Sequence, residues 1–318
     1  MTFQEPGAGA LDYFPCRYGK SKLLFRGPRK RLDGAYAAVL GGTETYGKFV
    51  ADPYPVLLER EIGMPVVNFG CMNAGVDLFV GDPTLVDACL RSRLTFIQLV
   101  GAHNMTNRFY AVHPRRNDRF LRASTLMKSL FPDVDFTEFH FTRHMLSKLK
   151  LRSPEKFLLV EAELKAAWVA RMHQLLGKLP GRKVLVWLSD YGPVPASDPL
   201  GSEPLLVDAQ MVAEVARRAN AVVRIDPSQG ARSAGTEGMR FGELEEMVAA
   251  NMPGPRVHAE IAAAFWPAAW PPGQTQGRDR LRAEGMPRAG VGRAQRRHVL
   301  SAFTWDGRRS RRTPRCGR

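Results

Sequence analysis

At residues 36–45 the chain reads Tyr36-Ala37-Ala38-Val39-Leu40-Gly41-Gly42-Thr43-Glu44-Thr45. An apolar run followed directly by two glycines predicts a buried strand that ends in a tight turn. In an open parallel sheet, ligands bind beyond the carboxyl ends of the strands. We therefore expect this turn to lie at the active edge of the molecule.

Strand and helix signals alternate along the rest of the chain. Further strands are expected at residues 65–70, 94–100, 183–188 and 221–225, and helices at residues 83–91, 137–149 and 154–176. Strands spaced by helix-length crossovers predict an α/β fold whose parallel sheet is covered on both faces. A helical insertion, residues 105–180, separates strands three and four. Its middle, residues 110–122, is dense in His, Arg and Asn and is expected to be a loop over the sheet edge.

Charge divides the chain into three regions. Residues 1–34 form a basic and aromatic N-terminal extension, residues 35–266 the α/β domain, and residues 267–318 an arginine-rich tail. Of the net charge of +15, residues 268–318 contribute +10, with 13 Arg and three acids. Such a composition predicts disorder. The composition is what translation of GC-rich DNA in the wrong reading frame would give, and we prefer this frameshift interpretation over an evolved RNA-binding tail. A tail of this kind would bind polyanions only weakly and without specificity.

The N-terminal extension carries seven Lys and Arg with no acid between Tyr13 and Leu32. It reads either as an arm that binds phosphate or nucleic acid, or as a segment whose aromatic side chains pack on the domain while its cations stay in water. We favour the second interpretation, because the aromatic residues lack the regular spacing of a stacking platform.

The cysteines and the lack of long apolar runs indicate the cellular compartment of the protein. The four cysteines are scattered, without the spacing of a zinc site or a disulfide framework. We expect a bacterial protein of the cytoplasm with no membrane span, no secretory signal, no metal and no cofactor. His140 and His144 lie four residues apart, but the pattern around them does not match a zinc motif. The oligomeric state is left open.

Three predicted strand ends carry polar or flexible residues that suit acyl chemistry. They are Gly42 and Thr43, then Gly70, then Asn104. A hydroxyl on a strand-to-helix turn can act as a nucleophile, while backbone N–H groups and an Asn side chain stabilise an oxyanion.

This order of residues resembles the SGNH hydrolases, esterases and lipases that are built on a flavodoxin-like three-layer sandwich. The resemblance covers residues 36–265 and places Thr43 at the nucleophile and His258 at the base. It places Gly70, Asn104 and the backbone N–H of Thr43 at the oxyanion hole, with Gly42 as a further oxyanion or substrate-binding residue. Thr43 stands where the family has Ser, and no Asp precedes His258 by three residues, although Asp226 or Glu260 could orient that ring. Residues 12–19, 40–50, 113–120 and 135–144 also resemble an uncharacterised bacterial family of SGNH-like proteins.

Each of these residues also has a simpler interpretation. Thr43 could cap a helix through the N–H of Tyr46, and His258 could be an ordinary residue at the start of a helix. In the insertion, Asn107, Arg108, His113 and Arg115 could bind an anionic group of a substrate, or form a solvated loop with salt bridges.

Two function hypotheses follow. The first is an SGNH-like hydrolase or acyltransferase that acts on a polar ester, anionic or linked to a saccharide. The second is an inactive SGNH-like domain that binds a saccharide or small anion. We expect a small-molecule or saccharide ester partner, and no nucleic-acid partner beyond non-specific contact by the tail.

Overall fold

The computed structural model describes residues 11–189, 191 and 198–269. The predicted tail therefore lies almost entirely outside the described residues. A five-stranded parallel sheet forms the centre, in the order β2-β1-β3-β6-β7. Its strands are β1 (Ala37–Gly41), β2 (Val66–Gly70), β3 (Leu94–Gln98), β6 (Lys183–Leu188) and β7 (Ala221–Ile225). This is the flavodoxin-like strand order, and it confirms the predicted fold class.

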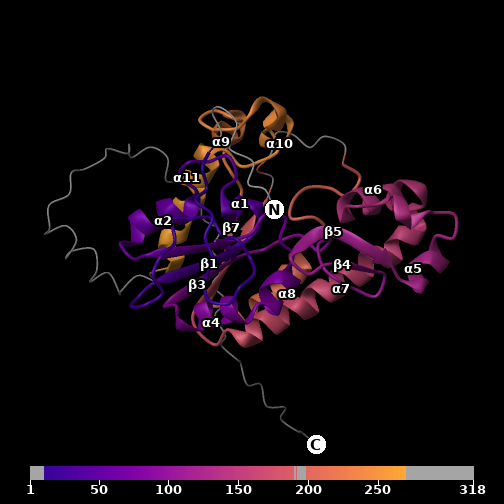
Figure 1. The fold of residues 1–318 in the computed structure, drawn as a ribbon, viewed down its shortest axis with the longest axis horizontal. Helices are drawn as coiled ribbons and strands as arrows, with labels where there is room; N and C mark the ends of the chain where they lie inside the picture. The colour runs from indigo at the N-terminus through magenta and orange to yellow at the C-terminus, as the bar shows by residue number, and fades with distance from the viewer. Residues whose placement is uncertain (1–10, 190, 192–197, 270–318) are drawn as a thin grey trace, which may run out of the picture.

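Helices cover both faces of the sheet (Figure 1). Along β1, Ala37 and Val39 belong to one hydrophobic core, while Ala38 and Leu40 belong to the other, as the alternation of side chains in a strand requires. The first core lies under α2 (Tyr54–Ile62) and α11 (Pro255–Ala269). The second lies under α3 (Val76–Gly81), α4 (Pro83–Arg91), α7 (Pro154–Lys178) and α8 (Ala209–Ala216).

Short helices complete the described chain. They are α1 (Thr43–Tyr46), α5 (Thr125–Leu130), η1 (Phe136–Glu138), α6 (Thr142–Arg152), α9 (Gln229–Ser233), η2 (Glu243–Glu245) and α10 (Glu246–Ala249). None of the helices in the described ranges is both long and apolar enough to cross a membrane.

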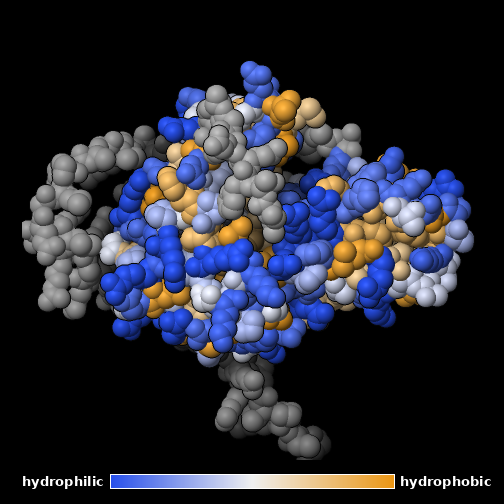
Figure 2. All heavy atoms as spheres, viewed as in Figure 1, coloured by the Kyte–Doolittle hydropathy of each residue, from blue (hydrophilic) through white to orange (hydrophobic). Residues whose placement is uncertain are grey.

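The insertion corrects one prediction. Residues 110–122 were expected to form a loop, but they form an antiparallel hairpin of β4 (Tyr110–His113) and β5 (Arg116–Ala123). Its inward side chains, among them Tyr110, Val112 and Phe120, are buried. With α5 and α6 the hairpin builds a lobe beside the sheet (Figure 1). The face seen in Figure 2 is mostly hydrophilic, and hydrophobic residues gather over this lobe.

The N-terminal segment packs on the domain rather than standing apart as an arm. Tyr18 and Phe25 are 2% and 0% exposed, and both rings contact Phe69 of β2. Arg26 donates to the carbonyl oxygens of Tyr46 and Ala51. This burial confirms the favoured interpretation for these aromatic residues, although Phe14 is exposed.

Candidate functional site

The turn after β1 packs tightly. A Cβ atom added to Gly41 would lie 1.9 Å from the Thr45 hydroxyl, so only glycine fits there. That hydroxyl bonds to the Tyr54 hydroxyl at 2.6 Å and to Gln98 of β3. The turn is therefore fixed from both the helix side and the sheet side.

Among the residues that the structure describes, the hydroxyl of Thr43 bonds to Asn73 alone. Its Oγ1 accepts from the backbone N–H of Asn73 at 2.9 Å and donates to the Asn73 side-chain oxygen at 3.3 Å. It does not cap α1, because Gly42 is the N-cap residue and the Tyr46 N–H donates to the Gly42 carbonyl. The helix-cap interpretation of Thr43 was wrong.

Asn73 follows the second predicted strand end, but the sequence assigned it no role in the site. It lies in the loop after β2 with φ of 53°, a left-handed conformation that Asn tolerates better than most residues. Its side-chain NH₂ donates to Asp118 of β5 at 3.2 Å. No spacing rule identifies such a residue, although an Asn two residues before Gly75 in a polar turn is a weak signal.

Asn104 also contacts Asn73. Its NH₂ donates to the Asn73 carbonyl at 3.2 Å, and its side-chain oxygen accepts from the Thr142 hydroxyl at 2.7 Å. The structure thus brings Thr43 and Asn104 together, with Asn73 between them. Asn104 is 5% exposed, so in this structure it holds the loop rather than facing solvent.

The two predicted glycine donors are occupied. The Gly42 N–H donates to the Gln98 side-chain oxygen at 3.0 Å, and the Gly70 N–H donates to the Asn68 side-chain oxygen at 2.8 Å. Neither N–H is available to an oxyanion. Gly70 has a packing role instead, because an added Cβ atom would lie 2.4 Å from the Tyr46 nitrogen of α1.

His258 is not placed as a base for Thr43. It lies on α11, its ring is 0% exposed and stacks on Tyr54 of α2, and its Nδ1 accepts from the Tyr54 N–H at 3.0 Å. Burial lowers the pKa of His258 to about 3, which keeps the ring neutral. The two carboxylates considered as partners that could orient the His258 ring bond to other residues. Asp226 accepts from the Ser189 hydroxyl, and Glu260 accepts from the Ser228 hydroxyl.

The four polar residues predicted in the insertion serve the local structure. Asn107 accepts from the N–H groups of Phe109 and Tyr110 in a turn, and Arg108 pairs with Glu163 of α7. His113 accepts from the Arg115 N–H at the hairpin turn, and Arg115 is exposed. None of the four has a hydrogen bond or ion pair to Thr43, Asn73 or Asn104.

Other polar side chains lie along this edge, linked to Thr43 and Asn73 or to one another by hydrogen bonds, ion pairs and charge interactions. We call the following set the edge cluster: Thr43, Glu44, Asn73, His103, Asp118, Arg143, Tyr191, Asp198 and Glu203. Arg143 forms ion pairs with Asp198 and Glu203. Glu44 accepts from Tyr191 at 2.6 Å and from Gln98 at 2.8 Å.

Several members of the edge cluster have shifted pKa values. Burial, and then the charge of Glu203, raise the pKa of Glu44. Burial lowers the pKa of His103 to about 3, and its Nδ1 has no hydrogen-bond partner among the described residues. Shifts of this kind concentrate at functional sites. Within the described residues, no group of three or more His, Cys, Asp or Glu is arranged to hold a metal ion.

Fold and site together define an α/β protein with a polar cluster at the carboxyl ends of a flavodoxin-like sheet. The chain belongs to the family described as "Domain of unknown function (DUF6473)", whose model matches residues 1–271. No curated protein matches the chain.

Solved structures of several esterases and related enzymes are similar at low identity. The lipase Lip_vut3 from a goat rumen metagenome is 12% identical over 74% of this chain and 98% of its own, with a TM-score of 0.40. A catalytic variant of Axe2, an acetylxylan esterase from Geobacillus stearothermophilus, is 16% identical over 73% and 92%, with a TM-score of 0.37. LAE5, an α/β hydrolase from a Lake Arreo metagenome, is 16% identical over 74% and 94%, with a TM-score of 0.34. TM-scores this low carry no argument about the function of this chain.

Proposed function

We propose that the carboxyl edge of the sheet binds a neutral polar ligand, a saccharide or saccharide ester, and that Thr43 is not a nucleophile. One observation carries this proposal: both hydrogen bonds of the Thr43 hydroxyl go to Asn73. The hydroxyl proton points to an amide oxygen, which does not take up a proton at neutral pH. A hydroxyl without a general base is a weak nucleophile, because activation requires a group that accepts its proton.

The accessible members of the edge cluster suit the hydroxyl groups of a saccharide. Asn73 and Arg143 are exposed, and Asp118, Asp198 and Glu203 are partly exposed. They offer amide, guanidinium and carboxylate groups, so both donors and acceptors converge on one edge. A few convergent polar groups at a sheet edge are typical of a small-molecule site.

The charges of the edge cluster favour a neutral ligand over an anion. The cluster contains four carboxyl side chains, Glu44, Asp118, Asp198 and Glu203, and Arg143 is its one cation. That cation is already paired with two of the four. Arg108 and Arg115, the cations predicted to attract an anionic substrate, lie elsewhere. An anionic ligand would meet like charges, which is costly where they are partly buried.

Binding is tested by ligand-detected NMR with a panel of neutral saccharides and the matching uronic acids. The proposal predicts saturation transfer to at least one neutral sugar, a weaker signal from its uronic acid, and loss of the signal in Asp118→Ala. Asp133→Ala is the matched control, because Asp133 pairs with Arg152 on the surface and is not in the edge cluster. Stronger binding of the uronic acids, or equal signals in the two variants, would contradict the proposal.

Catalysis is tested in parallel with p-nitrophenyl acetate and butyrate. The proposal predicts the same slow rate for the wild type and Thr43→Ala. Turnover that is lost in Thr43→Ala would favour the hydrolase hypothesis instead. The general base would then be a residue other than Asn73, the hydrogen-bond partner of Thr43 in this structure.

A further inference from the structure

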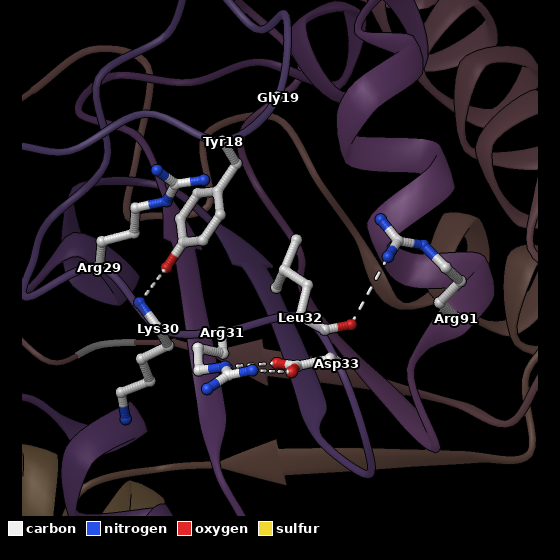
Figure 3. Close-up of a pocket in the computed structure, with 8 residues that line it drawn as sticks. All are labelled: Tyr18, Gly19, Arg29, Lys30, Arg31, Leu32, Asp33 and Arg91. Carbon is white, nitrogen blue, oxygen red and sulfur yellow. Dashed lines mark hydrogen bonds and ion pairs between the residues drawn. The ribbon is translucent and has the colours of Figure 1, made fainter.

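A basic pocket lies at the opposite edge of the sheet, near the amino ends of β1 and β3. Its lining comes from the N-terminal segment and the last turn of α4: Tyr18, Gly19, Arg29, Lys30, Arg31, Leu32, Asp33 and Arg91. Figure 3 shows these residues, with Arg29 and Arg91 on different sides of Leu32. The edge cluster shares no residue with this pocket.

The basic segment is held in place by buried aromatic contacts. The Tyr18 ring lies 5.8 Å from Phe25 and 5.1 Å from Phe69, centroid to centroid, and its hydroxyl accepts from the Lys30 N–H at 2.9 Å. The Arg91 side chain donates to the Leu32 carbonyl at 3.5 Å. The pocket is therefore formed by a fixed loop, which reduces the entropy that a ligand would have to overcome.

The cations of the pocket differ in their pairing. Lys30 pairs with Glu59, Arg31 with Asp33, and Arg91 with Asp87. Arg29 has no carboxylate partner in the described part of the chain; its guanidinium lies over the Tyr18 ring, 5.8 Å from the centroid. Four cations and three carboxylates therefore leave one positive charge, and it belongs to Arg29.

The rest of the N-terminal segment adds positive charge, while Asp82 at the start of α4 accepts a hydrogen bond from the Ser21 hydroxyl of this segment. Arg17, Lys20 and Lys22 lie in the same segment, are exposed and form no ion pair among the described residues. The segment from Tyr13 to Leu32 contains no Asp or Glu. Positive potential over this surface therefore comes from several residues, and within the described ranges Arg29 is the pocket cation without an ion pair.

We propose that this pocket binds a phosphate group of a small phosphorylated ligand, with Arg29 as the principal contact. A guanidinium presents paired N–H donors that match two oxygens of a phosphate, and Arg29 can do so without breaking an ion pair. The additional positive potential that a dianion needs comes from Arg17, Lys20 and Lys22 of the same segment, which form no ion pair among the described residues.

Isothermal titration of the full chain with inorganic pyrophosphate at low ionic strength tests the proposal. Wild type should bind, and Arg29→Ala should weaken binding about tenfold or more, the effect of losing a charge-assisted hydrogen bond. Arg256→Ala is the control, because Arg256 is an exposed arginine paired with Glu237 outside the pocket. The arginines of residues 270–318 are the same in every variant, so differences between variants report on the pocket.

Two results would overturn the proposal. One is the absence of pyrophosphate binding by the wild type at millimolar concentration. The other is an equal affinity of Arg29→Ala and Arg256→Ala, which would assign the anion to another basic segment. A comparison titration uses sodium sulfate at matched ionic strength. Sulfate that binds as tightly as pyrophosphate would show that the pocket recognises negative charge and not phosphate, which would also overturn the proposal.

Discussion

Gly70→Ala tests how the sheet positions the turn that carries Thr43. The added Cβ atom would lie 2.4 Å from the nitrogen of Tyr46 and 2.7 Å from the carbonyl carbon of Thr45. Both atoms belong to the backbone of α1, so a rotamer change cannot relieve the overlap. We expect α1 to move and the free energy of unfolding to fall by about 1–3 kcal/mol, the range for overpacking a tight interior.

Gly81→Ala is the matched control for this change. Gly81 ends α3, and an added Cβ atom there meets nothing within 4 Å. Alanine is favoured over glycine in a helix by up to ~1 kcal/mol, so this variant should be as stable as the wild type or more so. Urea unfolding followed by circular dichroism measures both variants. A Gly70→Ala variant within about 0.5 kcal/mol of Gly81→Ala would refute the close approach of β2 and α1.

Two further predictions concern burial away from the edge cluster. The pKa of His258 is about 3 in the folded state and ~6.5 when unfolded, so protons bind the unfolded chain more strongly and stability falls as the pH drops from 6.5 towards 3. His258→Asn keeps an acceptor for the Tyr54 N–H and removes this titration. The variant should therefore reduce the slope of the free energy of unfolding against pH by about 1.4 kcal/mol per pH unit near pH 5. An unchanged slope would show that His258 is not buried in its neutral form. Arg26→Ala removes the charged donors to the Tyr46 and Ala51 carbonyls and should cost about 2 kcal/mol or more in urea unfolding, whereas exposed Arg29→Ala should cost under about 1 kcal/mol. Equal costs would mean that the N-terminal segment does not depend on Arg26 for its docking.

The central sheet could be predicted because its strands are short apolar runs between clear breaks. The expected ranges 183–188 and 221–225 are those of β6 and β7, and 83–91 is that of α4. The hairpin of β4 and β5 was missed because His, Arg and Asn dominate its composition. Only the short strand β4 shows alternating burial, at Tyr110 and Val112. In β5 the buried residues Asn117, Phe120 and Ala123 lie three apart, and the pairing has register shifts, so the sequence carries no clear period-two signal there.

The site could be predicted only where it depends on strand ends. Thr43 and Asn104 lie at one edge because the carboxyl ends of parallel strands share it, and each bonds to Asn73. Asn73 and Asp118 join them through a left-handed turn and a hairpin from the insertion, and no sequence spacing encodes that contact. His258 had a warning in the sequence, since no Asp stands three residues before it. A histidine without an orienting carboxylate can have a structural role, and here the ring is buried and accepts a hydrogen bond from the Tyr54 N–H.

The state of the Thr43 hydroxyl is tested most directly by a fluorophosphonate probe and intact-protein mass spectrometry. The probe forms a covalent adduct with an activated nucleophilic hydroxyl and spares an unactivated one. Because the Thr43 hydroxyl bonds only to Asn73 within the described ranges, we predict no adduct on the wild type and none on Thr43→Ser after incubation with excess probe. One equivalent of adduct on the wild type that disappears in Thr43→Ala would contradict the account and establish Thr43 as a nucleophile.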